Sequence, residues 1–290
     1  MPASRHAARF FLGIAFLAAS IARADAASGC VWKVTAPSGG TLFLGGSVHA
    51  LRSSDYPLPP AYNRAFDASS RLVFEVDDKG LTQAGNELLK SGQYAKGDSL
   101  KNHVDPRTYD YLRRVFALMK VPEEKFARYR PWVLIWMMQS GSSSAFKEDL
   151  GVEEFLLKRA RATSKPIFGL ETVSEHARVF SGLNDRQGEA LLLLTFIPHA
   201  GSNDDTSRVM DAWRRGDADS LARAVHESFS DFPAFGRRIL DERNQRWIPK
   251  LEGYLRSGQT YFVVAGAGHM GGPGGVLNLM RERGYRIEQW

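Results

Sequence analysis

Short apolar runs alternate with longer stretches of helical spacing along the chain after residue 30. The runs are rich in β-branched and aromatic residues and are bounded by turn-forming residues, which is typical of strands. We predict strands over residues 31–34, 41–45, 71–76, 165–170, 260–265 and 285–288. The turn sequence Pro37-Ser38-Gly39-Gly40 separates the first two, so these are expected to pair as a hairpin.

Helix start signals lie between the predicted strands. Asp105 followed by Pro106 is an N-cap with proline at the first helical position. Asn184 with Gln187 resembles a capping box, and Asp217 or Asp219 opens a further helix. Strands well separated by helices predict a single α/β (mixed α+β) domain with a central sheet and a largely helical middle.

The first 26 residues have the layout of a secretory signal peptide. A positively charged start precedes a thirteen-residue apolar run over 10–22, and small residues in Ala22-Arg23-Ala24 and Ala24-Asp25-Ala26 offer cleavage sites. The run is shorter than the roughly 20 residues that a membrane-spanning helix needs. We therefore expect a signal peptide over 1–26 and one domain over 27–290, exported to the periplasm or secreted. A loose lipobox ending in Cys30 makes a lipoprotein the less favoured alternative.

The composition is that of a globular protein and excludes several other classes. Hydrophobic residues make up 43% and charged residues 24%, which are globular proportions. The net charge of +6 is spread along the chain without a long basic run, which argues against nucleic acid as a partner. The best later apolar run, 132–138, is too short to span a membrane. The single cysteine, Cys30, excludes a disulfide framework and thiolate-rich metal sites.

One pattern occurs twice. An apolar strand leads into Gly46-Ser47-Val48-His49, and another leads into Gly266-Ala267-Gly268-His269. Ligands in open parallel sheets gather beyond the carboxyl ends of the strands. Each motif would present an imidazole at that rim, so we expect His49 and His269 to converge on one site.

Two more strands end in carboxylates, Glu75 and Glu171. A buried carboxylate is costly unless it is paired, hydrogen-bonded or bound to metal. A capped or salt-bridged glutamate is one interpretation of each. Beside two histidines, the alternatives are a metal site with nitrogen and oxygen ligands or a His/Glu acid–base pair. These ligands would suit Zn, Mn, Co or Fe.

The helical pattern around residues 241–248 adds polar groups to an apolar stripe. Asn244 falls on the stripe and Arg243 flanks it. Such a residue needs a partner, so Asn244 is either a clamp on a backbone carbonyl or a holder of an oxyanion or carboxylate. The remaining mature histidines lack a matching motif and are expected to be structural or exposed: His103, His176, His199 and His226.

Taken together, these segments resemble the TraB/GumN family, which is related to the Tiki-type proteases. The resemblance covers residues 30–290 and is carried by Trp32–Val34, Leu42–Leu51, Leu72–Asp77, Arg130–Trp132, Gly151–Glu153, Phe168–Thr172, Glu242–Asn244 and Gly266–Gly275. Three positions depart from the usual family pattern: Ser47 stands where Thr is commoner, Glu153 where many members have Asp, and Met270 where Leu usually follows the second motif.

The resemblance implies two related βα halves, each ending a strand in Gly-x-x-His, and a protease that depends on a divalent metal ion. In that scheme His49, His269 and Glu75 form the metal or catalytic core. Glu171, Arg243 and Asn244 match further family positions and would orient that core or the substrate.

These observations favour an exported metal-dependent hydrolase, specifically a peptidase, acting on a peptide or small-molecule substrate. Glu75 or Glu171 would act as the base, and Arg243 or Asn244 would stabilise the oxyanion. The alternatives are a non-catalytic module that binds a peptide or other ligand, and an accessory protein of an envelope polysaccharide pathway. The last is suggested only by the family name.

Overall fold

The computed structural model of the chain describes residues 29–77, 85–87, 89–139, 146–196 and 202–290. The expected signal peptide and His199 lie outside the described residues. Cys30 lies near the start of the described chain, where its side chain is fully buried.

A mixed six-stranded sheet forms the centre of the domain, with strand order β4-β3-β5-β2-β1-β6. The strands are β1 (Val31–Thr35), β2 (Thr41–Ser47), β3 (Arg71–Val76), β4 (Ile167–Glu171), β5 (Tyr261–Gly266) and β6 (Arg286–Gln289). The expected hairpin is confirmed, since β1 and β2 pair antiparallel, and β6 also pairs antiparallel with β1. Strands β2, β5, β3 and β4 are parallel, so their carboxyl ends meet at one edge.

Helices occupy most of the chain between the strands. They are α1 (Pro60–Ala68), α3 (Pro106–Leu118), α4 (Glu123–Phe126), α5 (Pro131–Gln139), α6 (Val152–Ala162), α7 (Val173–Ser181), α8 (Asp185–Leu194), α9 (Ser202–Arg215), α10 (Ala218–Ser228), α11 (Pro233–Ile239), α12 (Asp241–Arg256) and α13 (Val276–Glu282). The predicted caps are confirmed, because Asp105, Asn184 and Asp217 each accept a backbone hydrogen bond at the start of a helix. The domain is therefore the mixed α/β domain that the sequence predicts.

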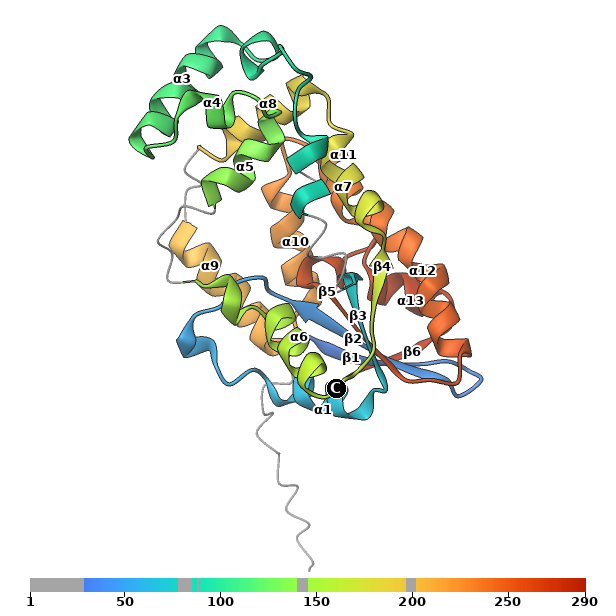
Figure 1. The fold of residues 1–290 in the computed structure, drawn as a ribbon. Coiled ribbons are helices and arrows are strands. Elements are labelled where there is room, and N and C mark those ends of the chain that lie inside the picture. Colours follow the sequence, from blue (N-terminus) through green and yellow to red (C-terminus); the bar gives the residue numbers. More distant parts are fainter. Residues whose placement is uncertain (1–28, 78–84, 88, 140–145, 197–201) are drawn as a thin grey trace, which may run out of the picture.

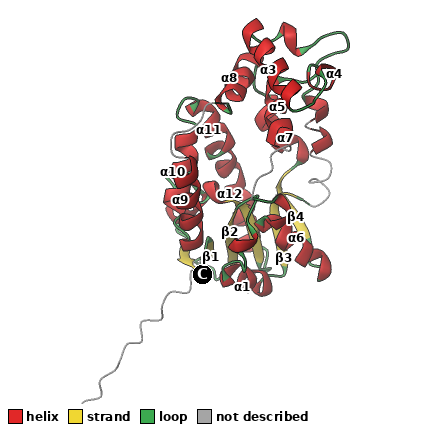
Figure 2. Ribbon diagram, turned by 90° about the vertical axis from the view of Figure 1, so that its left-hand side faces the viewer, coloured by secondary structure: helices red, strands yellow, loops and turns green. Residues whose placement is uncertain are grey.

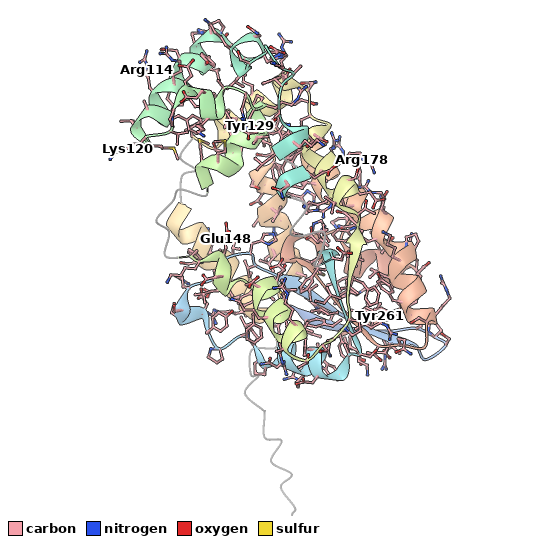
Figure 3. The ribbon with its side chains drawn as sticks, viewed as in Figure 1. Arg114, Lys120, Tyr129, Glu148, Arg178 and Tyr261 are labelled. Atoms are coloured by element: carbon pink, nitrogen blue, oxygen red, sulfur yellow. The ribbon has the colours of Figure 1, made fainter. Side chains whose placement is uncertain are left out.

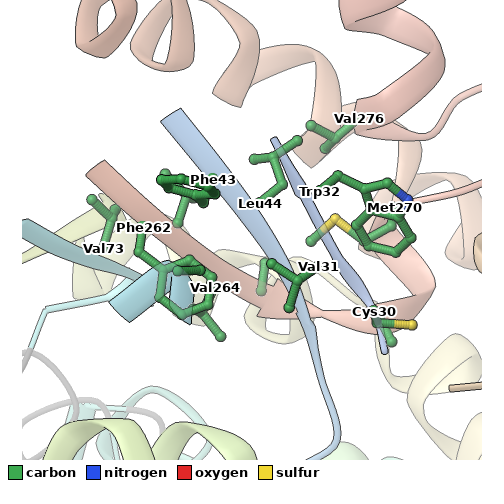
Figure 4. Packing of buried hydrophobic residues seen from close by; sticks show 14 of the residues in the cluster. Cys30, Val31, Trp32, Phe43, Leu44, Val73, Phe262, Val264, Met270 and Val276 are labelled. Atoms are coloured by element: carbon green, nitrogen blue, oxygen red, sulfur yellow. The ribbon is translucent and has the colours of Figure 1, made fainter. Parts of the chain in front are cut away.

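The sheet lies between helices on both faces. Figure 2 shows α1 and α6 on one side of it and α10 and α12 on the other. The strands supply the centre of the main hydrophobic core, in which Phe262 and Val264 are almost completely buried. Figure 4 shows Phe43, Leu44 and Phe262 around neighbouring strands, with Met270 close to Trp32. Because both faces of the sheet are buried, the sequences of β2, β3 and β5 are continuous apolar runs instead of alternating apolar and polar residues.

The helical middle of the chain forms a lobe with a hydrophobic core of its own. Residues 77–166 and 172–260 both leave the sheet at its carboxyl edge, from the ends of β3 and β4. Leu112, Phe116, Phe126, Trp132 and Leu192 belong to this second core, which is separate from the core around the sheet. Figure 1 shows α3, α4, α5 and α8 together at the end of the molecule away from the sheet.

Figure 3 gives the same division at the level of side chains, with Arg114, Lys120 and Tyr129 in the helical lobe and Tyr261 at the sheet. Within the part of the chain that the structure describes, no helix has both the length and the hydropathy needed to cross a bilayer.

Candidate functional site

The parallel strands bring the two Gly-x-x-His motifs next to each other. In the register of β2 and β5, Gly46 lies opposite Ala265 and Ser47 opposite Gly266. His49 follows β2, and His269 ends a short 3-10 helix that follows β5. Glu75 is the second-last residue of β3, and Glu171 ends β4. These two histidines and two glutamates therefore lie at the carboxyl ends of four adjacent parallel strands.

Arg243, on α12, lies at the centre of these strand ends. Its Nε and Nη2 donate to the two carboxylate oxygens of Glu171 at 2.9 Å each. Nη2 also donates to Glu75 Oε2. The side chain of Arg243 is only 4% exposed, and its guanidinium lies 4.9 Å from the centre of the Trp247 ring. One buried cation thus compensates two carboxylates from neighbouring strands.

Glu171 has no acceptor capacity left. Besides the two bonds from Arg243, it accepts from Trp247 Nε1 at 3.0 Å and from His176 Nδ1 at 3.3 Å. An ionised carboxylate has about four lone-pair sites, and all are engaged here. Burial favours the neutral acid, but the hydrogen bonds from His176 and Arg243 prevail and lower the pKa of Glu171 to about 2. Glu171 is therefore an ionised anchor for Arg243.

Glu75 differs from Glu171 in having lone pairs to spare. Its Oε1 accepts from the backbone N–H of Gly266 at 2.9 Å, and its Oε2 accepts from Arg243. Burial would raise its pKa, but the charge of Arg243, with His269 and the Gly266 bond, holds the pKa well below its ordinary range. Glu75 is more exposed than Glu171, at 16% against 4%. It is the carboxylate in this network that can still bind something.

His269 is held in one orientation and one tautomer. Its Nδ1 donates to Asn244 Oδ1 at 2.7 Å, while Asn244 Nδ2 donates to the carbonyl of Gly274 at 2.8 Å, which fixes the amide. Nε2 accepts from Arg243 Nη1 at 3.2 Å and lies 3.9 Å from Glu75 Oε1. Burial, with a smaller effect of Arg243, lowers the pKa of His269 to about 4. His269 is thus a neutral imidazole whose single Nε2 lone pair accepts from Arg243, with Glu75 3.9 Å from that nitrogen.

Asn244 combines two of the roles that the sequence leaves open. It clamps a backbone carbonyl through Nδ2, and through Oδ1 it orients His269. With Oδ1 bound to His269 and one N–H of Nδ2 bound to Gly274, only the second N–H of Nδ2 could serve an oxyanion.

His49 lies in a different environment. Its side chain is 78% exposed, and Nδ1 lies 3.1 Å from Glu153 Oε1. The hydrogen bond and charge of Glu153 raise the pKa of His49 to about 9, and the charge of Glu75 adds to this shift. His49 is therefore an imidazolium at neutral pH. It lies close enough to Glu75 for the charge of that carboxylate to raise its pKa further.

The donor set has the chemistry that a divalent metal ion requires, but the ligands are not gathered. Both motif histidines have Nδ1 engaged by a side-chain oxygen, the arrangement that metal-ligating histidines show. Nε2 is the nitrogen that would bind an ion, which requires that of His269 to leave Arg243 and that of His49 to lose its proton. Glu75 adds an ionised oxygen donor. Among the described residues, however, no three His, Cys, Asp or Glu side chains lie close enough together to hold an ion as they stand.

Three residues at the site were not among those expected there. His176, expected to be structural or exposed, contacts Glu171, and Trp247, on the same helix as Arg243, donates to it. Glu153 contacts His49 from α6. The position of Trp247 four residues after Arg243 was a usable signal, since such residues share a helix face. The contact of His176 is local, because α7 begins two residues after Glu171. The contact of Glu153 depends on how distant segments pack.

The remaining described histidines lie elsewhere. His103 bridges Asp98 and Asp185 at 2.7 Å each, and His226 lies 3.5 Å from Asp241.

The fold and the site define a class of protein: an α/β domain in which two Gly-x-x-His motifs and two glutamates share the carboxyl edge of the sheet. The model of the TraB/PrgY/gumN family matches residues 30–289, so the chain belongs to this family.

Two relatives extend this finding. The chain is 23% identical over 302 residues to a protein of Danio rerio named "Metalloprotease TIKI2", in a match that covers 85% of this chain and 58% of that protein. It is 25% identical over 275 residues to an uncharacterized protein of Treponema pallidum (strain Nichols), covering 87% of this chain and 80% of that protein. The chain thus spans little more than half the length of the first relative. No solved structure matches the chain significantly.

Proposed function

We propose that this protein is a metal-dependent hydrolase that cleaves peptide bonds at the carboxyl edge of the sheet. The observation that carries the proposal is the juxtaposition of His269 and Glu75, in which the Nε2 atom of a neutral imidazole held through Nδ1 lies 3.9 Å from an ionised carboxylate with lone pairs to spare. Membership of the family and the similarity to a protein named as a metalloprotease support this reaction class.

His269 and Glu75 would hold the metal ion, with His49 as a third ligand. Nitrogen and oxygen donors of this kind suit Mn, Co, Zn or Fe. Bound there, the ion would act as a Lewis acid and lower the pKa of a water molecule.

The hydrogen bonds around the proposed ligands indicate the roles of Glu171, Arg243 and Asn244. Because the acceptor sites of Glu171 are all occupied, Glu75 is the carboxylate of this network with lone pairs left for an ion. Arg243 keeps both carboxylates ionised and fixes their spacing. Asn244 keeps the proton of His269 on Nδ1, so that Nε2 carries the lone pair, which Arg243 occupies in this arrangement.

The N-terminal sequence supports a location for the reaction outside the cytoplasm. A positive start, a short apolar run and small residues at the cleavage sites support export, so the substrate would be a peptide or protein segment met outside the cytoplasm.

The proposal is tested by incubating the purified protein with a mixture of synthetic peptides and added Mn²⁺ or Co²⁺, followed by mass spectrometry. We expect new termini with the wild type, and at least about a 10- to 100-fold slower reaction with Glu75→Gln, since removing even a residue that supports a metal ligand costs about that much in activity. Glu282→Gln, the same change at an exposed position on α13, is the matched control.

Undiminished cleavage by Glu75→Gln would contradict the proposed site. A peptide that binds and is recovered intact after long incubation would instead favour a non-catalytic binding module.

A further inference from the structure

The loop that carries His49 is held by a segment about a hundred residues further along the chain. Residues Leu51 and Lys147 form an isolated antiparallel bridge, with N–H to carbonyl distances of 3.2 and 2.9 Å. Val152 N–H donates to the carbonyl of Val48 at 3.1 Å. Gly151 packs so closely that a Cβ there would lie 2.2 Å from the carbonyl oxygen of His49. The start of α6 is therefore docked directly on the Gly-x-x-His loop.

This docking places the carboxylate of Glu153 beside His49. Glu153 Oε1 accepts from Ser47 Oγ at 2.5 Å and from His49 Nδ1 at 3.1 Å. The other oxygen, Oε2, is buried and has no hydrogen-bond partner among the described residues. The side chain of Glu153 is 23% exposed, so its carboxylate is partly buried, and the contacts of Oε1 with Ser47 and His49 offset that partial burial.

We infer that Glu153 is a positioning residue for His49: it accepts a hydrogen bond from Nδ1–H, which keeps the proton on Nδ1 and leaves Nε2 as the nitrogen that a ligand would bind. Ser47 assists by fixing the carboxylate oxygen that accepts this hydrogen bond. The inference rests on the proposed function, in which His49 is a ligand of the metal ion.

The same device holds the other motif histidine. On the β5 side, Asn244 of α12 accepts from Nδ1 of His269, and on the β2 side, Glu153 of α6 accepts from Nδ1 of His49. Two unrelated helices thus supply a side-chain oxygen to the same ring nitrogen of the two matched motifs. A contact of structural value alone has no reason to select Nδ1 in both. Oxygen acceptors on the far nitrogen are what orient metal-ligating histidines.

The inference predicts that Glu153 acts on metal affinity only through His49. Mn²⁺ alone is the probe, with its affinity measured by competition with a chelating dye. Glu153→Ala should weaken binding about 10- to 100-fold. In a His49→Gln background, the same change should weaken it no further. Equal weakening in both backgrounds, or none in either, would overturn the inference.

Two further variants distinguish a specific effect of Glu153 on metal affinity from a general loss of structure in α6. Glu154→Ala changes the neighbouring residue on α6, which pairs with Lys158 at the surface, and should leave the affinity unchanged. Glu153→Gln keeps an acceptor oxygen in place and should retain more affinity than Glu153→Ala. The inference fails if Glu154→Ala weakens binding as much as Glu153→Ala.

A second measurement needs no metal. Nitrogen-15 NMR of the histidine rings at about pH 10, where neutral imidazole prevails, reports which nitrogen carries the proton. We expect Nδ1–H for His49 in the wild type and a shift toward Nε2–H in Glu153→Ala. An unchanged tautomer would overturn the inference. If the wild type binds no Mn²⁺, the proposed function fails, and the NMR result alone decides the role of Glu153.

Discussion

Arg243 sets the charge state of the site, because its guanidinium is buried between the carboxylates of Glu75 and Glu171. Two ionised carboxylates from adjacent strands would repel each other without it. The planar guanidinium of Arg243 donates two parallel hydrogen bonds to Glu171 and a further one to Glu75. A lysine ammonium cannot reproduce this geometry. The stability of the site therefore depends on the shape of this cation as well as on its charge.

Replacing Arg243 by lysine should lower the free energy of unfolding by about 2–4 kcal/mol, since buried acceptors lose their partners while the charge is kept. Urea unfolding measures this loss. Arg246→Lys, at an exposed position of the same helix, should change stability by less than about 0.5 kcal/mol. Similar small effects of both changes would contradict the account of the network.

Acidification should destabilise the protein in two successive steps. The folded pKa of His269, about 4, lies below its ordinary value of 6.5 because the ring is buried, so the unfolded chain takes up this proton first. The stability that depends on neutral His269 is lost as the pH falls from 6.5 toward 4. For Glu171, with a folded pKa of about 2 against 4.5, the loss follows as the pH falls from 4.5 toward 2.

The contribution of Glu171 in the lower window is on the order of 3 kcal/mol. Urea unfolding at a series of pH values should show a flatter profile below pH 4.5 for Glu171→Gln than for the wild type. Glu282→Gln should keep the slope of the wild type. A profile that is the same for all three proteins would show that Glu171 is not held ionised by its partners.

Single residues of the site could be named from the sequence where one strand or one helix determines their position. His49, His269, Glu75 and Glu171 follow from strands ending in polar residues, and Asn244 from its place on an apolar stripe. The occupancy of Glu171 and the contact of Glu153 could not be predicted, since each depends on residues more than 70 positions apart in sequence. Which oxygen remains free is a property of tertiary packing.

At the level of elements, the loop after β5 is shaped by the close approach of α10. A Cβ on Gly271 would lie 2.2 Å from the carbonyl carbon and oxygen of Ala218, at the start of that helix. Since the obstacle is backbone, α10 or the loop would have to move. His269 lies two residues before Gly271, so such a movement would also displace the imidazole.

We expect Gly271→Ala to lower the melting temperature and to weaken Mn²⁺ binding together. The matched change, Gly253→Ala, lies in α12 with open space around the new methyl group. It should raise stability by up to about 1 kcal/mol, because alanine favours the helix over glycine. Thermal unfolding with and without Mn²⁺ measures both effects. Tolerance of alanine at Gly271 would contradict the close packing of this loop.

The elements themselves could be predicted well because each has a local signature. The strands appear within about two residues of the expected ranges, and Asp105, Asn184 and Asp217 mark true helix starts. The strand order could not be predicted, because β1 and β6 pair from opposite ends of the chain. Periodicity tells which face of an element is buried but not which other element covers it.

At the scale of the whole molecule, the site lies where two separately packed bodies meet. Among the residues that the structure describes, the sheet core and the core of the helical lobe share none, although both insertions that build the lobe start at the strands carrying Glu75 and Glu171. Separate cores favour separate units of local unfolding. The sequence predicts a helical middle, but only the packed structure reveals its independent core.

Truncating Phe116 should loosen the lobe and leave the sheet intact. Phe116 is fully buried and stacks on Phe126 with ring centres 4.4 Å apart. Replacement by alanine should cost about 3–5 kcal/mol of local stability. Hydrogen exchange followed by mass spectrometry should show lost protection in α3, α4 and α5, with β2 and β5 still protected. Phe262→Ala, in the sheet core, is the counterpart and should expose the strands. Uniform loss of protection in both variants would contradict the division into two cores.

The central claim is that His49 and His269 serve one metal ion together with Glu75. Equilibrium dialysis against Mn²⁺ followed by elemental analysis tests it most directly, with the wild type, His49→Gln and His269→Gln compared. His226→Gln, a partly exposed histidine on α10, is the control. The account predicts one ion per chain in the wild type and the control, and loss of the ion in both motif variants. An ion that stays bound in both motif variants, or a wild type that binds none, would contradict it.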